Sequence, residues 1–434
     1  MHADSVEDGL DRIICPREAG AQIYTDHGLE LSEIDPDALK VLRRLARYGF
    51  QSYLVGGCVR DLLCGLHPKD FDIATSATPK QLRKLFRNSR VIGRRFRLVH
   101  IHFGDNILEI STFRRNANQE DEASEADKTT DGEADEEDLL IRHDNVFGTA
   151  DEDARRRDFT INALFFDVLT KEVIDFVGGM PDLRARRIET IGEPVTRLRE
   201  DPVRMLRAAK FAGRLDFDLA DDLVAAIKET HEDILRAAIP RLYEELQRML
   251  DRGGAYRAFQ ILHDTEVLRM LLPELATCLE TTEGAHDRFL TLLRALDRQV
   301  VEGRSVNNLV MLSCLVLPIF EHIMEHEGPT PEGVPPVHYD IGAMTDRMLD
   351  PLAARLQMPR RDLYCIKQIL MGLRRLLAAK AARRRPSPNQ IVRKDYFLDS
   401  LRLLAVYARS HGRLQGDVIK WQRRYEEVTG REFD

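Results

Sequence analysis

Residues 51–75 read QSYLVGGCVRDLLCGLHPKDFDIAT, which predicts a strand, a glycine turn, a short helix and a second strand. The first apolar run ends at Gly56 and Gly57, where the absence of a Cβ allows dihedral angles and close approaches that other residues disfavour. A helix that starts directly after such a turn offers unpaired backbone N–H groups to a phosphate. We therefore expect a phosphate-binding turn at these glycines, with Arg60 near the start of the helix.

Two aspartates, Asp70 and Asp72, begin the second strand of this segment. Alternate side chains of a strand share a face, so both carboxylates are expected on one side, with Phe71 pointing into the core. Neighbouring carboxylates repel each other unless a cation lies between them, and Mg²⁺ is usually held by one or two carboxylates plus substrate phosphates. The pair, with Lys69 beside it, predicts a metal site for phosphoryl or nucleotidyl transfer. For such a pair alone, a solvated acidic strand end is the alternative.

The segments LVGGCVRDLLCG and PKDFDIAT resemble the signature of polymerase-β-type nucleotidyltransferases, and more narrowly the bacterial branch that holds poly(A) polymerases and tRNA CCA-adding enzymes. The resemblance is specific over residues 50–250 and loose over residues 250–434. It implies an α+β fold, in which a nucleotidyltransferase head with a mixed sheet and helices precedes all-α neck, body and tail domains. The segment GRRFRLVHI is more similar to the poly(A) polymerase version than to the CCA-adding version.

Further motifs receive roles from this resemblance. Glu109 stands at an E-x-x-T-F-R position, which implies a third metal ligand or a support of the active site; a cross-strand partner for an arginine is the alternative. The R-R-D motif implies that Arg157 binds phosphates and that Asp158 accepts a ribose hydroxyl within the active site. The E-D-x-x-R motif implies that Asp201 and Arg204, expected on neighbouring helix positions, read the edge of the base.

The activity implied is template-independent addition of AMP from ATP to RNA 3′ ends, with release of pyrophosphate. Two Mg²⁺ ions, replaceable by Mn²⁺, would bind Asp70 and Asp72, and an mRNA, small RNA or tRNA would supply the 3′ end. The residues expected to contact the phosphates of ATP are Gly56, Gly57, Arg60 and Lys69. A tRNA CCA-adding or A-adding enzyme would share all of these residues and is the second hypothesis. A catalytically inactive RNA-binding scaffold is the third.

Composition limits the class of protein. The 434 residues are 43% hydrophobic and 31% charged, as in soluble globular proteins. No run approaching about 18 apolar residues is apparent, so no membrane helix is expected. The first residues lack the basic and apolar regions of a signal peptide. The six cysteines show no C-x-x-C spacing, which favours a reducing compartment. We expect a cytoplasmic monomer.

The length predicts about three structural units at roughly 150 residues each. The expected order is a leader (1–35), a catalytic head (36–180), a helical neck (181–255) with the base-recognition motif, and a helical body and tail (256–434). Residues 118–138 are rich in acids and contain no large apolar side chain, so they predict a disordered loop within the head.

The C-terminal part carries an excess of positive charge. Residues 351–434 contain 19 Lys+Arg against 8 Asp+Glu. Such an excess favours contact with a polyanion, although basic helix faces that merely solvate are the alternative. The candidate RNA contacts in this part are Arg383, Arg384 and Arg385. Aromatic residues nearby could stack on bases, although most are expected to bury in helix packing.

Overall fold

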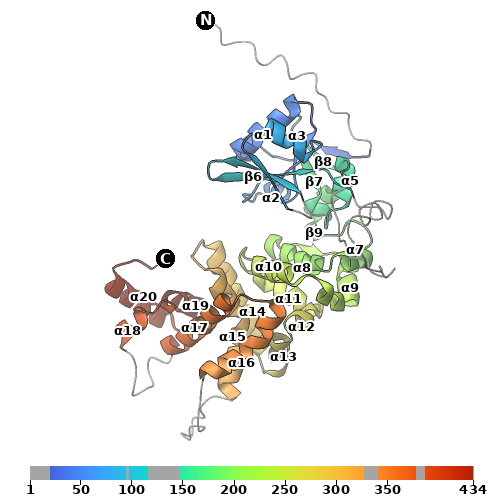
Figure 1. Cartoon of the computed structure of the whole chain (residues 1–434). Coiled ribbons are helices and arrows are strands. Elements are labelled where there is room, and N and C mark those ends of the chain that lie inside the picture. Colours follow the sequence, from blue (N-terminus) through green and yellow to red (C-terminus); the bar gives the residue numbers. More distant parts are fainter. Residues whose placement is uncertain (1–19, 94–96, 116–146, 327–340, 378–386, 434) are drawn as a thin grey trace, which may run out of the picture. The chain divides into compact units, whose positions relative to one another are not determined.

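The computed structural model describes residues 20–93, 97–115, 147–326, 341–377 and 387–433. The contacts divide the chain into two compact units, of which the first comprises Met1–Asp201 and Leu219–Leu223 and the second comprises Pro202–Asp218 and Val224–Asp434. Figure 1 shows a sheet with helices in the first unit and helices throughout the second. The acidic segment 118–138 and the arginines 383–385 lie outside the described residues. The finer division into head, neck, body and tail stays a prediction.

An eight-stranded mixed sheet lies at the centre of the first unit. Its order is β1-β8-β7-β2-β3-β6-β5-β4. Strands β3 and β6 run parallel, and the other neighbours are antiparallel. The strands are β1 (Gln22–Tyr24), β2 (Ser52–Val55), β3 (Ile73–Thr75), β4 (Ser89–Ile92), β5 (Leu98–Phe103), β6 (Asn106–Thr112), β7 (Leu164–Asp167) and β8 (Glu172–Asp175). The two strands expected on either side of the glycine turn are thus adjacent, near the middle of the sheet.

The described residues of the first unit also form six α-helices, several of them capped by side chains. They are α1 (Pro36–Arg47), α2 (Gly57–Leu63), α3 (Pro79–Leu85), α5 (Ala150–Arg155), α6 (Gly179–Ala185) and α7 (Pro194–Glu200). Asp35 caps α1 by accepting hydrogen bonds from two backbone N–H groups, and Thr78 forms a capping box with Gln81 at α3. Helix α1 contacts β2 and β3, and α3 contacts β4 and β5. Both helices are labelled close together in Figure 1.

Two segments of the first unit differ from the expectation. The apolar run FTINALFFDV at residues 159–168 favours a strand, but the strand starts only at Leu164, because Thr160–Asn162 forms a 3₁₀ turn. Polar side chains stabilise this turn: Asp158 accepts from Asn162 Nδ2 at 3.0 Å, and Thr160 Oγ1 donates to Asp182 at 2.7 Å. In addition, the expected leader is not separate from the sheet, since its residues 22–24 pair with β8 as an edge strand.

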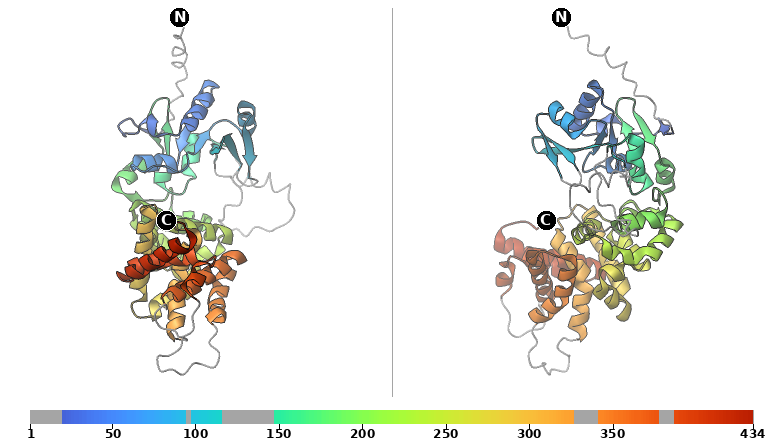
Figure 2. Two further views of the ribbon diagram at one scale, coloured as in Figure 1. Left: turned by 90° about the vertical axis from the view of Figure 1, so that its left-hand side faces the viewer. Right: turned by 45° about the vertical axis from the view of Figure 1, so that its right-hand side comes forward.

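The second unit is built of helices that pack on one another, as both views of Figure 2 show. Helix α8 contacts α10 and α11, α14 contacts α19, and α17 contacts α15 and α19. The helices of this part of the chain are α8 (Val203–Leu215), α9 (Asp221–Thr230), α10 (Ile239–Leu250), α11 (Ala255–Asp264), α12 (Val267–Leu271), α13 (Pro273–Thr281), α14 (Ala285–Val301), α15 (Asn308–His326), α16 (Ile341–Leu356), α17 (Arg360–Leu377), α18 (Pro388–Val392), α19 (Phe397–His411) and α20 (Gln415–Thr429).

One helix of this unit bears on the expectation that the chain has no membrane helix. Within α15, Asn308–Glu325 could span a membrane by length and composition, with a mean hydropathy of 1.4. However, 61% of this window is buried inside the protein, where α15 contacts α10, α13, α14, α16, α17 and α19. A helix surrounded by other helices needs apolar residues on most of its faces, which accounts for its composition.

A buried ion pair joins two helices near the start of the second unit. Lys210 of α8 donates to Glu245 of α10, and Arg207 and Arg248 approach the same carboxylate at 3.5 and 3.6 Å. Burial, followed by the charge of Arg207, lowers the pKa of Lys210 to about 8 against the opposing effect of Glu245. The Glu245 carboxylate therefore holds α8 and α10 together, which is a structural role.

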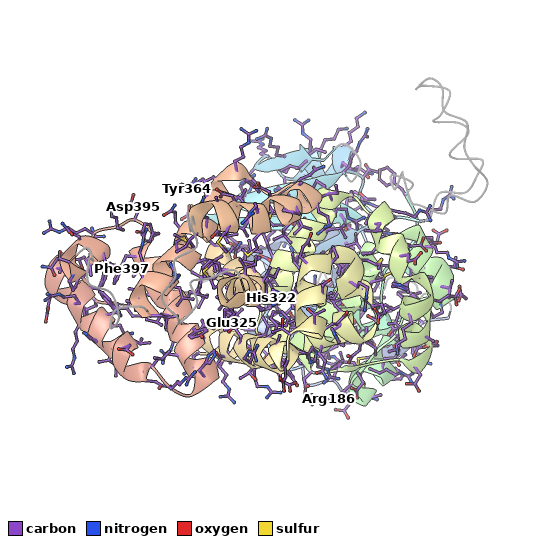
Figure 3. The ribbon with its side chains drawn as sticks, turned by 90° about the horizontal axis from the view of Figure 1, so that it is seen from below. Arg186, His322, Glu325, Tyr364, Asp395 and Phe397 are labelled. Carbon is purple, nitrogen blue, oxygen red and sulfur yellow. The ribbon has the colours of Figure 1, made fainter. Side chains whose placement is uncertain are left out.

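Two of the C-terminal aromatics, Phe397 and Trp421, are packed rather than presented to solvent. Phe397, labelled in Figure 3, is 1% exposed, and Trp421 is 5% exposed. The ring of Phe397 lies 5.9 Å from that of Trp421 and 6.0 Å from that of Tyr425. These rings hold α19 and α20 together, so Phe397 and Trp421 are not available for stacking on bases.

Candidate active site

The glycine turn between β2 and α2 has the geometry that the sequence predicts. Gly56 has φ +72° and ψ −127°, a conformation that residues with a Cβ rarely adopt. A Cβ built at Gly56 would lie only 2.8 Å from a terminal guanidinium nitrogen of Arg157. At Gly57, the first residue of α2, the nearest atom to such a Cβ would be 3.6 Å away. Gly56 is therefore needed both for its dihedral angles and for the approach of Arg157.

This difference predicts opposite results for alanine at the two positions. We expect Gly56→Ala to lower the free energy of unfolding by about 1–3 kcal/mol, the usual cost of a residue in a sparsely populated backbone region. Gly57→Ala is the matched control, and it should leave stability unchanged or raise it slightly, because alanine favours the helix. Urea unfolding of both variants measures the difference. Equal stability of the two variants would contradict the role given to Gly56.

The two aspartates lie directly before β3, which starts at Ile73. The pairing with β2 nevertheless continues, since the Val55 backbone N–H donates to the Asp72 carbonyl at 3.1 Å. Asp70 and Asp72 are exposed, whereas Phe71 between them is 9% exposed. This alternation is what an extended segment with both carboxylates on its open side requires.

The parallel pairing of β3 with β6 brings a third carboxylate to this place. Ile73 is opposite Ile110, so the preceding residues, Asp72 and Glu109, are neighbours across the two strands. Asp72 remains accessible to solvent, but protein atoms crowd it on most sides. This partial desolvation, followed by the charge of Glu109, raises the pKa of Asp72 to about 6; Arg157 opposes the shift and Asp70 adds to it.

The alternative role expected for Glu109 was pairing with an arginine across the strands. Glu109 does have a cross-strand partner, but that partner is a histidine. His100 of β5 lies directly opposite, with its Nε2 atom 3.1 Å from Glu109 Oε1. Because a histidine is charged only when protonated, this contact gives Glu109 less compensation than an arginine would. A role for Glu109 as a metal ligand stays a prediction.

The donor chemistry of this place fits Mg²⁺. All three candidate ligands supply carboxylate oxygens, which this hard cation prefers. Burial first, and then the charges of Glu109 and Asp70, raise the pKa of Asp72, and a bound divalent cation would oppose these effects. Within the described residues, no group of three or more His, Cys, Asp or Glu side chains is placed so that it could hold a metal ion. The residues that would hold Mg²⁺ together with substrate phosphates are thus Asp70 and Asp72.

The R-R-D segment is organised by an aspartate that the motif analysis did not single out. Asp153 is fully buried and accepts hydrogen bonds from Arg156 Nε at 3.0 Å, from Arg157 at 2.9 and 3.3 Å, and from the Arg114 backbone N–H at 3.1 Å. Burial alone would raise the pKa of Asp153, but the charges of Arg157 and Arg156 outweigh burial and lower it. The spacing of three and four residues from Asp153 to the arginines was a usable signal in the sequence.

A buried hydrogen-bond network connects the helix after the glycine turn to Asp158. Arg60 is 2% exposed; it donates to Asp61 at 2.6 and 2.9 Å and to Asn162 Oδ1. Asn162 donates in turn to Asp158 Oδ1, which also accepts from the Phe159 backbone N–H at 2.9 Å. These contacts give Arg60 a positioning function, and its direct contact with a phosphate stays a prediction.

The remaining candidate site residues are Lys69, Asp201 and Arg204. Lys69 is exposed beside Asp70. Asp201 was expected on the same helix as Arg204, but it lies outside that helix. It follows the end of α7 with φ −147° and ψ 90°. The reason is Pro202, since a residue before proline is pushed out of the helical region. Arg204 lies in α8, in the second unit, and is 5% exposed. The base-reading roles of this pair stay predictions.

Comparison with known proteins agrees with this arrangement. A family model for the poly A polymerase head domain matches residues 52–189, and a model described as a probable RNA and SrmB-binding site of polymerase A matches residues 216–279. Poly(A) polymerase I of Salmonella typhimurium is 40% identical over 362 residues, which cover 80% of this chain and 72% of that protein. The chain belongs to the bacterial poly(A) polymerase family. Poly(A) polymerase I of Haemophilus influenzae is 34% identical over 401 residues, 91% of this chain and 85% of that protein.

Solved structures agree on the fold. The crystal structure of the Bacillus stearothermophilus CCA-adding enzyme in complex with CTP has a TM-score of 0.66 at 24% identity, covering 91% of this chain and 83% of that one. This likeness, together with the head-domain match, confirms the expected fold class of a nucleotidyltransferase head followed by helices. Membership of the poly(A) polymerase family confirms the expected enzyme class, a polynucleotide adenylyltransferase.

Proposed function

We propose that the protein adds AMP from ATP to RNA 3′ ends without a template. The observation that carries this proposal is the pair Asp70 and Asp72 directly before β3, beside the glycine turn of a chain whose residues 52–189 match the poly A polymerase head domain. The glycine turn, Arg157 and Asp158 belong to the same part of the first unit, because Arg157 lies beside Gly56 and its charge acts on Asp72, and Asn162 binds Asp158. These contacts support one site, in which we assign the acidic groups to metal, the turn to phosphates and Asp158 to the ribose.

Each group has a defined task in this proposal. Asp70 and Asp72 would hold two Mg²⁺ ions, for which Mn²⁺ can substitute, and the bound metal would supply activation of the RNA 3′-hydroxyl and stabilisation of the departing pyrophosphate. The Gly56 backbone N–H donates to the Leu164 carbonyl at 3.2 Å, so Gly56 contributes the turn. The Gly57 backbone N–H, with Lys69, binds the triphosphate. Arg157 adds a planar charged donor for its oxygens, and the RNA oxygen attacks the α-phosphorus in line.

Base selection and the ribose contact complete the proposal. Asp158 accepts a hydroxyl of the ribose, and Asp201 accepts the exocyclic amine of the base while Arg204 donates to a ring nitrogen. The RNA substrate is an mRNA, small RNA or tRNA, bound in part by arginines 383–385. We also propose a cytoplasmic location, which agrees with the absence of paired cysteine spacing.

A tRNA CCA-adding enzyme is the second candidate, favoured by the shared fold with the Bacillus stearothermophilus enzyme. The relatives that match 80% and 91% of the chain are both named poly(A) polymerase I, which is why polyadenylation is preferred.

An incorporation assay distinguishes these functions. The purified protein is incubated with Mg²⁺ and either ATP or CTP, and with either a generic RNA or a tRNA that lacks its 3′ end. We expect repeated AMP addition to both RNAs and little CMP addition. Addition of two CMP residues restricted to tRNA would replace the proposal with CCA addition. No turnover with any pair of substrates would indicate a scaffold without catalytic activity.

A further inference from the structure

One arginine of the first unit connects two elements that the proposed function uses separately. Arg197 of α7 is 6% exposed. A terminal nitrogen of Arg197 donates to the backbone carbonyl of Arg156 at 2.9 Å and to that of Arg157 at 2.8 Å. Its other terminal nitrogen pairs with the carboxylate of Glu200, at the end of the same helix. Each anchor is next in the chain to a proposed nucleotide contact, because Asp158 follows Arg157 and Asp201 follows Glu200.

The hydrogen bonds of Arg197 satisfy backbone carbonyls at the end of a helix. The last carbonyls of a helix lack partners within the helix, and α5 ends immediately before Arg156. A guanidinium donates in a fixed planar fork, so it can satisfy two carbonyls on one side and a carboxylate on the other. A buried charge persists only when it is paired and hydrogen-bonded in this way. The turn at Gly192, with φ +95°, lies against the stem of Arg197, with an ideal Cβ 3.6 Å from its Cδ atom.

We propose that Arg197 is a positioning residue that fixes Asp158 and Asp201 relative to each other and thereby sets the enzyme's selectivity for the nucleotide. This inference rests on the proposed function, because it assigns the ribose contact to Asp158 and a base contact to Asp201. The two aspartates are 43 positions apart in the chain, and the fork of Arg197 is a direct connection between their segments. Arg197 itself does not touch the reacting atoms in this scheme.

The consequence is a defect in selectivity as well as in rate. A displacement of about 1 Å of a positioning group costs about a hundredfold in rate. Loss of the fork frees the segment that holds Asp158 and the segment that holds Asp201 at the same time. Discrimination between ATP and CTP should therefore fall together with discrimination between ATP and dATP. A contact that only stabilised the fold would lower the amount of active enzyme and leave both ratios unchanged.

The test compares Arg197→Met and Arg197→Lys with the full-length wild type. Methionine keeps the aliphatic stem but removes all donors, whereas lysine keeps the charge but cannot form the planar fork. For each protein, kcat and KM are measured with ATP, CTP and dATP on one RNA. We expect Arg197→Met to raise KM for ATP and to lower both selectivity ratios at least tenfold. Arg197→Lys should lower the two ratios less than Arg197→Met does. Thermal unfolding reports how much of each variant is folded.

Matched controls separate the possible results. Arg184 of α6 lies in the same unit, is exposed and stacks over Tyr24 at 5.2 Å, so Arg184→Met should keep wild-type selectivity. Glu200→Gln removes the charge at one arm of the fork only, and a selectivity loss smaller than that of Arg197→Met is expected. Wild-type selectivity ratios in folded Arg197→Met would overturn the inference while leaving the proposed function intact. A wild-type enzyme that incorporates no AMP would instead overturn the proposed function, and the inference with it.

Discussion

Asp70→Ala is expected to lower AMP incorporation by at least about a thousandfold. In the proposed function Asp70 helps to hold the metal ions, so its loss should remove several kcal/mol of transition-state stabilisation. Each 1.4 kcal/mol corresponds to about a tenfold loss of rate. Asp70 is exposed directly before β3, next to the buried Phe71, so its carboxylate does not support the core. Single-turnover incorporation of labelled ATP, with saturating Mg²⁺ and RNA, measures the loss.

The fold should survive this substitution. The carboxylate of Asp70 contributes to the unfavourable negative charge around Asp72, so its removal relieves repulsion and does not break a stabilising contact. The matched control is Asp105→Ala, which removes an exposed carboxylate from the hairpin between β5 and β6. Asp105→Ala should keep wild-type activity, and both variants should unfold at the wild-type temperature. Activity retained in Asp70→Ala would refute the assignment of the metal site.

The sequence was sufficient where the signal was local. The two glycines, the short helix and the alternation around Phe71 are contiguous, and each follows from backbone geometry that neighbouring residues determine. The hairpin of β5 and β6 was predictable for the same reason, since a short polar turn separates two apolar runs.

Contacts between distant segments could not be predicted in this way. The approach of Glu109 to Asp72 depends on the parallel pairing of β3 with β6, whose partners are 37 positions apart. Without the family resemblance, no periodicity in the sequence selects that pairing. The fork of Arg197 depends similarly on how α7 packs against the segment that follows α5. The position of Asp201 was wrong for a local reason, because helical spacing was extended across the residue before Pro202.

Asp153→Asn is expected to destabilise the first unit by about 3–5 kcal/mol, the usual cost of breaking a buried ion pair by removing one partner. Asp153 is completely buried and is the common acceptor for Arg156, Arg157 and the backbone of Arg114. Asparagine preserves its shape but leaves both guanidinium groups without their shared charge. Because Arg157 occupies the space beside Gly56 where a Cβ would lie, and its charge acts on Asp72, AMP incorporation should fall along with stability.

The pH dependence of the destabilisation by Asp153→Asn identifies its electrostatic origin. The folded-state pKa of Asp153 is lowered, because the charges of Arg157 and Arg156 outweigh the effect of burial. A carboxylate with a lowered pKa contributes stability that is complete above its unfolded pKa, near 4, and that is lost as pH falls through the folded pKa. The difference in urea unfolding between wild type and Asp153→Asn should therefore be largest near pH 7 and should shrink below about pH 4.

A neighbouring carboxylate supplies the control for this prediction. Asp151 pairs with Arg155 on the exposed side of α5, where their side chains are 36% and 57% exposed. An exposed pair of this spacing contributes only about 0.3–0.5 kcal/mol, so Asp151→Asn should be nearly neutral at every pH. Both substitutions remove one negative charge from the same helix, so a difference between them reflects burial and the paired arginines, not the net charge of the unit. Equal destabilisation by the two variants would show that Asp153 does not organise the R-R-D segment.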